Sequence, residues 1–275
     1  GELDLVELQN AIRPDTALIA VMWANNETGV VFPIEKIAKL VKSENPETKI
    51  YVDAVQAAGK LPINVKSLPI DMLGISGHKI HAPKGIGALY VKSGTLLTPL
   101  IIGGHQEFGK RAGTENVQSI IGLGEACRQA AEYLKDGVQK TQYLRDKLEN
   151  ALLNKIYNAR LNSNTKDRVP NTTNIGFEYV EGELILLHMS DLGICASSGS
   201  ACTSGSLDPS HVLLAIGRPH EVAHGSLRLS LSEDVTEEEI DYLIKSVKEV
   251  VEYLRNMSPF WRDLVNGKRP HVFAE

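Results

Sequence analysis

Long apolar runs are missing from this 275-residue chain, and so is any large excess of positive charge. No stretch of apolar residues approaches the roughly 20 that a membrane-spanning helix needs. The net charge is -5, with acidic and basic residues interspersed, so the chain offers neither a basic surface for nucleic acid nor a polybasic membrane anchor. We therefore expect neither a nucleic acid nor a membrane as a partner.

Cysteine is scarce as well, with only 3 residues in the chain. An odd number of cysteines without paired spacing indicates a reducing compartment, and we predict a cytoplasmic protein. Cys127 and Cys195 lie in or next to apolar stretches, so we expect both to be buried and unreactive. We expect no metal site.

The composition otherwise suits a folded enzyme, with 43% hydrophobic and 23% charged residues. Up to about Val91, apolar strand-like runs alternate with helical patterns, which predicts βαβ units and a mostly parallel sheet. The predicted strands span residues 17–23, 49–53, 71–76 and 86–92, and a helix spans 33–43. The fold class is therefore α/β, with a partial large domain followed by a smaller α+β domain.

The second half mixes helices and strands. Helices are predicted over residues 116–134 and 137–153, strands over 173–177 and 227–231, and a further helix after Thr236, which forms a capping box with Glu239. We place the end of the large domain at residue 134 and assign residues 135–275 to the small domain. The aromatic tail after Met257 either packs against this small domain or binds a partner.

Asp53 and Lys79 carry the clearest chemical signal. Each follows a short apolar run at the point where a parallel α/β sheet presents its ligand-binding groups. Pyridoxal phosphate needs one lysine for a Schiff base and one acid against its ring nitrogen, and this pair supplies both. For either residue alone, an exposed lysine or a turn aspartate is the better interpretation, because most Lys and Asp are simply solvated.

A second constellation supports the first. Residues 197–206 read Ser-Ser-Gly-Ser-Ala-Cys-Thr-Ser-Gly-Ser, so Cys202 is flanked almost entirely by small side chains. Glycine and small residues make a flexible tether, which predicts that the thiol of Cys202 is a mobile nucleophile.

With these motifs in place, the chain resembles the cysteine desulfurases of the NifS/IscS type, which belong to the class-V aminotransferases and the fold-type I pyridoxal phosphate enzymes. The resemblance covers nearly the whole chain. The residues of the motifs Trp23–Gly29 and Arg111–Asn116 are closer to those of the NifS branch, which is named for nitrogen fixation. It rests on eight motifs in the family's order: Trp23–Gly29, Asp53–Gln56, Ser76–Lys79, Pro83–Gly87, Gly103–Glu107, Arg111–Asn116, the Cys202 segment and Ala223–Arg228.

The resemblance implies roles for the cofactor-binding residues. Lys79 would hold pyridoxal 5'-phosphate covalently, and Asp53 would pair with its ring nitrogen. Gln56 and Asn26 would hydrogen-bond its ring oxygen. The phosphate would be bound by two residues from the same chain, Ser76 and His78.

The resemblance also implies a homodimer, because Thr114 would reach the phosphate of the partner subunit's cofactor. Asn26 and Arg228 would bind the carboxylate of the substrate, L-cysteine, a task that suits the planar guanidinium. From the residues alone, Arg228 would be the exposed face of a strand, because apolar and polar residues alternate around it. Cys202 would take the sulfur as a persulfide, for an iron-sulfur scaffold protein of the NifU/IscU kind.

Family members are longer at the N-terminal end, so this chain would lack the N-terminal third, including a phosphate-binding loop and a histidine that stacks on the cofactor. His81, His105 and His224 do not match that histidine. Two alternatives stay open: a selenocysteine lyase or aminotransferase of the same fold, and an inactive truncated module that only binds partners. An aminotransferase would have no use for the Cys202 thiol.

Overall fold

The computed structural model describes residues 1–198 and 208–272, which divide into two compact units. The first, the parallel-sheet unit, comprises Leu3–Ala24 and Phe32–Lys135. The second, the antiparallel-sheet unit, comprises Gly1–Glu2, Asn25–Val31 and the chain from Asp136 onward. The short segment Asn25–Val31 thus belongs to the unit formed mainly by the C-terminal half. The sequence analysis placed Asn25–Val31 in the large domain and did not anticipate this assignment. The domain boundary at residue 134 stays a prediction.

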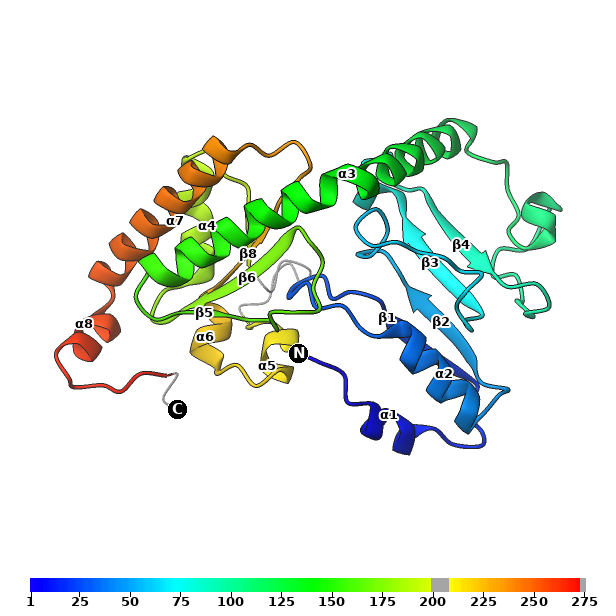
Figure 1. The fold of residues 1–275 in the computed structure, drawn as a ribbon, viewed down its shortest axis with the longest axis horizontal. Helices are drawn as coiled ribbons and strands as arrows, with labels where there is room; N and C mark the ends of the chain where they lie inside the picture. Colours follow the sequence, from blue (N-terminus) through cyan, green and yellow to red (C-terminus); the bar gives the residue numbers. More distant parts are fainter. Residues whose placement is uncertain (199–207, 273–275) are drawn as a thin grey trace. The chain divides into compact units, whose positions relative to one another are not determined.

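Four strands form the sheet of the parallel-sheet unit, in the order β1-β2-β3-β4 (Figure 1). β1, β2 and β3 run parallel, and β4 pairs antiparallel with β3. The mostly parallel α/β sheet predicted from the sequence is therefore confirmed, with strand ends within one residue of those expected. The bounds are β1 Leu18–Met22, β2 Lys49–Asp53, β3 Met72–Ser76 and β4 Gly87–Val91.

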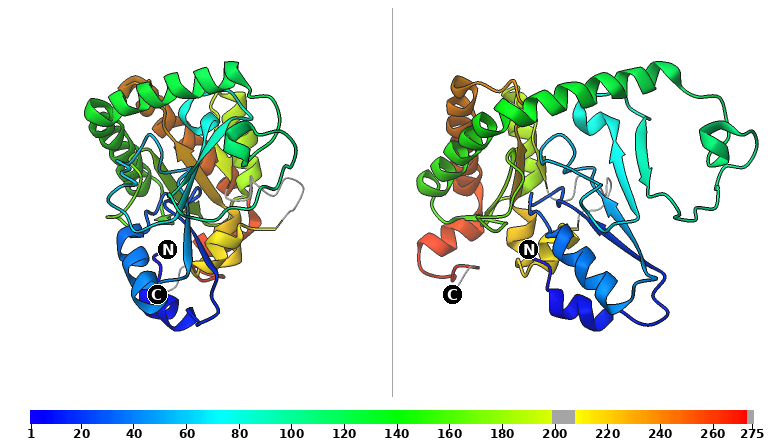
Figure 2. Two further views of the ribbon diagram at one scale, coloured as in Figure 1. Left: turned by 90° about the vertical axis from the view of Figure 1, so that its right-hand side faces the viewer. Right: turned by 45° about the vertical axis from the view of Figure 1, so that its right-hand side comes forward.

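Helix α2, Ile34–Glu44, packs its apolar face against this sheet. Pro33 precedes its first residue, as expected of a proline that fixes the backbone at a helix start. α1, Leu5–Ala11, lies beside α2, as both views in Figure 2 show. The unit also holds two short 3-10 turns, η1 Gly77–Ile80 and η2 Gln106–Gly109.

A single helix, α3, spans Val117–Lys155 and connects the two units. The prediction of two helices, 116–134 and 137–153, was wrong. A glycine such as Gly137 costs a helix interior about 1 kcal/mol relative to alanine. Burial of one leucine contributes about 1.5–3 kcal/mol, and the C-terminal half of α3 buries three: Leu144, Leu148 and Leu152.

The antiparallel-sheet unit has a second four-stranded sheet, in the order β5-β6-β8-β7. All its neighbours are antiparallel. Its helices include α7, which begins with the predicted capping box of Thr236 and Glu239. The strands are β5 Ala159–Leu161, β6 Thr172–Phe177, β7 Ser197–Ser198 and β8 Ser226–Ser230, and the helices are α4 Gly182–Asp191, α5 His211–Ala215, α6 His220–His224, α7 Glu237–Met257 and α8 Pro259–Val265.

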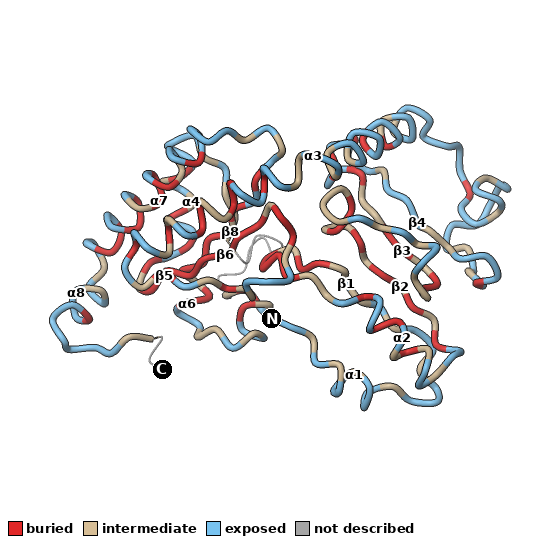
Figure 3. The backbone as a smooth tube through the Cα atoms, viewed as in Figure 1, coloured by how far each residue is buried: buried red, intermediate tan, exposed pale blue. Residues whose placement is uncertain are grey.

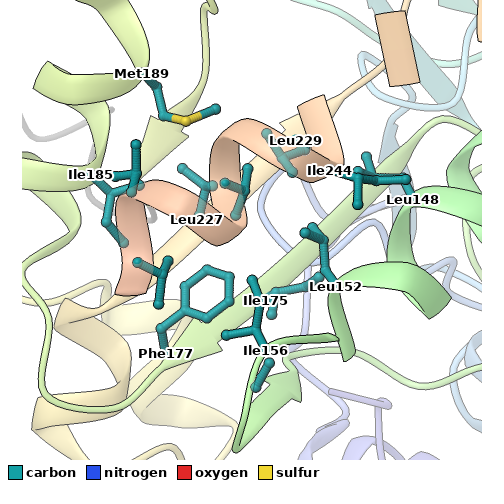
Figure 4. Packing of buried hydrophobic residues seen from close by; sticks show 14 of the residues in the cluster. Leu148, Leu152, Ile156, Ile175, Phe177, Ile185, Met189, Leu227, Leu229 and Ile244 are labelled. Carbon is teal, nitrogen blue, oxygen red and sulfur yellow. The ribbon is translucent and has the colours of Figure 1, made fainter. Parts of the chain in front are cut away.

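Both faces of β6 are covered, and every one of its residues is buried (Figure 3). On one face, Ile175 and Phe177 pack with side chains from β8, α3, α4 and α7 to form the apolar core shown in Figure 4. On the other face, polar Asn174 meets the segment Asn25–Val31. No helix in the described parts of the chain is long and apolar enough to cross a membrane.

The tail after Met257 packs against the antiparallel-sheet unit, which is the first of the two alternatives above. The Arg255 guanidinium lies 4.0 Å from the centre of the Trp261 ring. Further along, the Tyr179 hydroxyl donates to the Pro270 carbonyl at 2.8 Å, and His271 Nδ1 lies 3.0 Å from the buried Glu178 carboxylate. Burial lowers the pKa of Arg255 to about 10.

Leu148→Ala tests the core of the antiparallel-sheet unit, because Leu148 is fully buried on α3. We expect a loss of about 2–5 kcal/mol in unfolding free energy. The matched control is Leu187→Ala on α4, where the leucine is 63% exposed and the change should stay within about 0.5 kcal/mol. Urea unfolding followed by Trp261 fluorescence, in a Trp23→Phe background, measures both. Equal losses would mean that the core is placed wrongly.

Candidate active site

Asp53 ends β2, and the backbone around it is tightly held. Its carbonyl accepts a hydrogen bond from the Trp23 N–H at 2.8 Å, and its Oδ1 accepts the Val55 N–H at 2.9 Å. The side chain is half-buried. These bonds fix the carboxylate at the C-terminal edge of the sheet, where β2 pairs in parallel with β3.

Tyr51 lies two residues earlier on the same face of β2 and was not singled out by the sequence. Its hydroxyl fills the space beside Gly74 of β3, where an added Cβ would lie 2.5 Å from that oxygen. Burial, together with the negative charge of Asp53, raises the pKa of Tyr51. A tyrosine in a strand is common, so no sequence signal could have marked it.

Ser76, His78 and Lys79 lie where β3 turns into η1. The Ser76 Oγ and His78 Nδ1 are 2.8 Å apart, and the side chains of His78 and Lys79 are exposed. The turn itself is anchored by buried Gly77 and Ile80. A Cβ on Gly77 would lie 2.8 Å from Ile86 Cγ2, so only glycine fits there without movement.

The turn after β2 packs directly against η1, and this contact brings the two groups together. Gly59, with a left-handed φ of 73°, approaches so closely that an added Cβ would lie 2.9 Å from Ile80 Cγ2. Gln56, in the same turn, is half-buried and accepts a hydrogen bond from Lys60 Nζ at 3.2 Å. The ends of β2 and β3 and the turns that follow them thus lie at one edge of the parallel-sheet unit, and they carry Asp53, Gln56, Ser76, His78 and Lys79.

Thr114 is exposed in the loop between η2 and α3. The cap of α3 is Asn116, whose Oδ1 accepts the Ser119 N–H at 3.3 Å. Thr114 is therefore not the residue that caps this helix. Its predicted contact with the partner subunit's cofactor stays a prediction.

Asn26 and Arg228 meet in the antiparallel-sheet unit. Arg228 lies on β8, and its Nη1 donates to the Asn26 carbonyl at 2.8 Å. The arginine is half-buried, not fully exposed as the alternation along the strand alone suggested. The structure thus brings together the two residues that were predicted to bind a substrate carboxylate.

Cys202 lies outside the described residues, which stop at Ser198 in β7 and resume at Asp208. β7 pairs with β8, and Ser197 lies opposite Arg228. Cys127 and Cys195 are exposed, so the expectation that both are buried was wrong. Cys127 follows the buried Ala126 on α3 and points away from the packed face, and Cys195 lies in the connection from α4 to β7.

Three buried polar residues near Arg228 were missed: Glu27, Asn174 and Ser210. Asn174 pairs with Arg228 across β6 and β8. Its Nδ2 donates to the Glu27 carbonyl at 3.1 Å, and the Ser210 hydroxyl donates to the Glu27 carboxylate at 2.5 Å. Only tertiary packing brings these residues together, so the sequence offered no signal.

Residues 1–243 match the family model of the class-V aminotransferases. A cysteine desulfurase of Trichormus azollae is 57% identical over 96% of this chain, and the cysteine desulfurase NifS of Azotobacter vinelandii is 51% identical over 95%. The chain spans 65% and 64% of these two relatives. Two solved structures are similar in fold, each at 37% identity: a NifS-like protein (TM-score 0.84, covering 92% of this chain and 66% of that one) and the NifS-like protein of Rickettsia africae (0.81, 90% and 65%).

Gly77→Ala tests the packing of the lysine-bearing turn. The added methyl would press on Ile86 and Ala82, and such overpacking costs about 1–3 kcal/mol. Gly124→Ala is the control, because nothing lies within 4 Å of its added Cβ in α3, and alanine there should stabilise the helix by up to about 1 kcal/mol. Urea unfolding reported by Trp23, in a Trp261→Phe background, measures both. A neutral Gly77→Ala would contradict the described packing.

Proposed function

The chain belongs to the class-V aminotransferase family, and we propose that it forms the larger part of a pyridoxal-phosphate-dependent cysteine desulfurase. The observation that supports the proposal is the position of Asp53 at the end of β2 and of Lys79 in the turn that follows the parallel neighbour β3. The substrate would be L-cysteine and the products L-alanine and an enzyme persulfide. The NifS-named relative and the Cys202 motif support this choice over other members of the family.

The residues at this edge suit pyridoxal phosphate chemically. Lys79 offers an exposed amine for covalent attachment, and Asp53 offers a fixed carboxylate for the ring nitrogen. Ser76 and His78 are hydrogen-bonded to each other and offer donors for the phosphate. When bound, pyridoxal phosphate draws electrons from the α-carbon of an amino-acid substrate.

Gln56 would hydrogen-bond the ring oxygen of the cofactor, and the resemblance assigns Asn26 the same role. We further propose a homodimer in which Thr114 contacts the phosphate of the partner's cofactor. The exposed Thr114 hydroxyl supports this, since Asn116 already caps the helix that follows. Lys79, once released from the cofactor, would move a proton at the substrate α-carbon.

Arg228 would bind the substrate carboxylate through its planar guanidinium, and Asn26 would assist. Cys202 as a thiolate would attack the sulfur of L-cysteine. An S–S bond forms, the carbon–sulfur bond of the substrate breaks, and the carbon takes up a proton to give L-alanine. The terminal sulfur of the persulfide would then pass to an iron-sulfur scaffold protein.

Lys79→Ala should remove the visible absorbance of bound pyridoxal phosphate, because no other lysine lies in η1, the 3-10 turn after β3. Lys84→Ala, the nearest alternative lysine, should keep that absorbance. The assay uses the full-length product of the gene, purified with added cofactor and scanned in the visible range. Retention of the band in Lys79→Ala, or its loss in Lys84→Ala, would overturn the assignment of Lys79.

Cys202→Ala should leave cofactor and L-cysteine binding intact but stop persulfide formation, because the thiol acts only after the substrate is bound. Cys195→Ala removes an exposed thiol just before β7 and is the matched control. Binding is followed by the change in cofactor absorbance on addition of L-cysteine, and turnover by alanine formation. Wild-type alanine formation in Cys202→Ala would exclude it as the nucleophile and favour a lyase that needs no thiol.

A further inference from the structure

Glu27 is a carboxylate in an unusual setting, since only 4% of the residue is exposed. Burying an ionised carboxylate is costly unless hydrogen bonds or charges compensate for the lost water. Burial raises the pKa of Glu27, although a hydrogen bond from Ser210 and charge interactions with His211 and Arg228 partly offset this effect. A residue kept in place at such a cost calls for a specific role.

The hydrogen bond from Ser210 to Glu27 has a fixed direction. Ser210 is the N-cap of α5, and its Oγ accepts the N–H groups of Val212 and Leu213 at 3.1 and 3.3 Å. A hydroxyl has two acceptor sites and one proton. Because the cap uses both acceptor sites, the hydroxyl proton is left to be donated to Glu27 Oε2. The two oxygens, Ser210 Oγ and Glu27 Oε2, are 2.5 Å apart. The side chain of Glu27 is thereby anchored to α5.

The backbone of Glu27 is anchored as firmly as its side chain. Its carbonyl accepts a hydrogen bond from Asn174 Nδ2 of β6 at 3.1 Å. Its N–H donates to Asn25 Oδ1 at 2.9 Å, in a turn that the same oxygen also holds through the Thr28 N–H. The segment then joins the β5–β6 connection through Val31 and Val169, whose N–H groups donate to Asp167 and Gly29.

One peptide plane links these anchors to Arg228. The N–H of Glu27 and the carbonyl of Asn26 belong to the same planar peptide unit, so fixing one fixes the other. That carbonyl is the oxygen to which Arg228 Nη1 donates at 2.8 Å. The direction of the guanidinium therefore depends on how Glu27 is held.

We infer that Glu27, with Ser210, is a positioning residue for Arg228 and sets the geometry in which this arginine receives the substrate carboxylate. The claim about the substrate carboxylate rests on the proposed function, in which Arg228 binds L-cysteine. The claim that Glu27 and Ser210 position Arg228 does not depend on the proposed function. Glu27 itself is not expected to contact the substrate.

The direct test measures how firmly Arg228 is held in the 275-residue chain. Phenylglyoxal modifies accessible arginines, and peptide mass spectrometry gives the rate at each site. Glu27→Ala and Ser210→Ala should each speed modification of Arg228 on the order of tenfold, the factor expected for loss of a hydrogen bond to a charged group. Glu27→Gln keeps an acceptor oxygen for Ser210 and should restore most of the protection.

Two controls separate positioning from general loosening of the fold. Arg255 of α7, whose guanidinium donates to the Tyr157 and Glu178 carbonyls at 2.6 and 3.2 Å, is an internal reference and should keep its wild-type rate. Glu249→Ala removes an exposed glutamate of α7 and should leave Arg228 unchanged. A parallel rise at Arg255, or a wild-type rate at Arg228 in both Glu27→Ala and Ser210→Ala, would overturn the inference.

The link to substrate is tested in the full-length gene product. Glu27→Ala and Ser210→Ala should raise KM for L-cysteine on the order of tenfold, with a smaller change in kcat. Faster Arg228 modification with an unchanged KM would overturn the claim that this network sets substrate binding. If the wild-type protein does not act on L-cysteine at all, the proposed function fails, and the modification rates still decide whether Glu27 positions Arg228.

Discussion

The parallel pairing of β2 with β3 is the constraint on which the candidate cofactor site depends. Parallel neighbours end at the same edge of a sheet, so Asp53 at the end of β2 and Lys79 just past β3 are presented together. Glycine makes the approach possible, because Gly59 lets the turn after β2 press against Ile80. Tyr51 completes the arrangement by filling the space beside Gly74.

The antiparallel-sheet unit holds one charged side chain, Arg228, in a defined direction. The side chain is held by a buried polar network around Asn25–Val31. This segment belongs to the antiparallel-sheet unit although it follows closely on β1 in the sequence. Glu27, Asn174 and Ser210 form this network from three parts of the chain. The carbonyl of Asn26, next to Glu27, accepts the hydrogen bond that orients Arg228. Such networks stabilise a single arrangement only when each buried group has a partner.

Local sequence patterns predicted most elements of the fold. Apolar runs located β1, β2, β3, β4, β6 and β8 to within one residue, whereas the short strands β5 and β7 were not predicted. Thr236 with Glu239 marked the start of α7, because such signals act over a few residues. The break near Gly137 was wrong, since burial on both sides of it outweighs a glycine's local preference. The expected burial of Cys127 and Cys195 failed because apolar neighbours in sequence do not fix which way a side chain points.

The site residues divide in the same way. Lys79, Asp53 and Arg228 stand in motifs that resemble a known family, so the sequence alone was enough to propose them as site residues, and their roles stay predictions. Glu27, Asn174 and Ser210 acquire their roles only through contacts between residues far apart in the chain, such as Glu27 with Ser210. Tyr51 likewise depends on its neighbour in β3, Gly74.

The lysine to which the cofactor attaches decides most directly whether the candidate site is correct. The full-length gene product is mixed with pyridoxal phosphate, reduced with borohydride and digested, and the modified lysine is located by peptide mass spectrometry. We predict a pyridoxyl group on Lys79, the lysine on the turn that Gly77 and Ile80 anchor. A pyridoxyl group on Lys84 or on any other lysine, with Lys79 unmodified, would contradict this assignment.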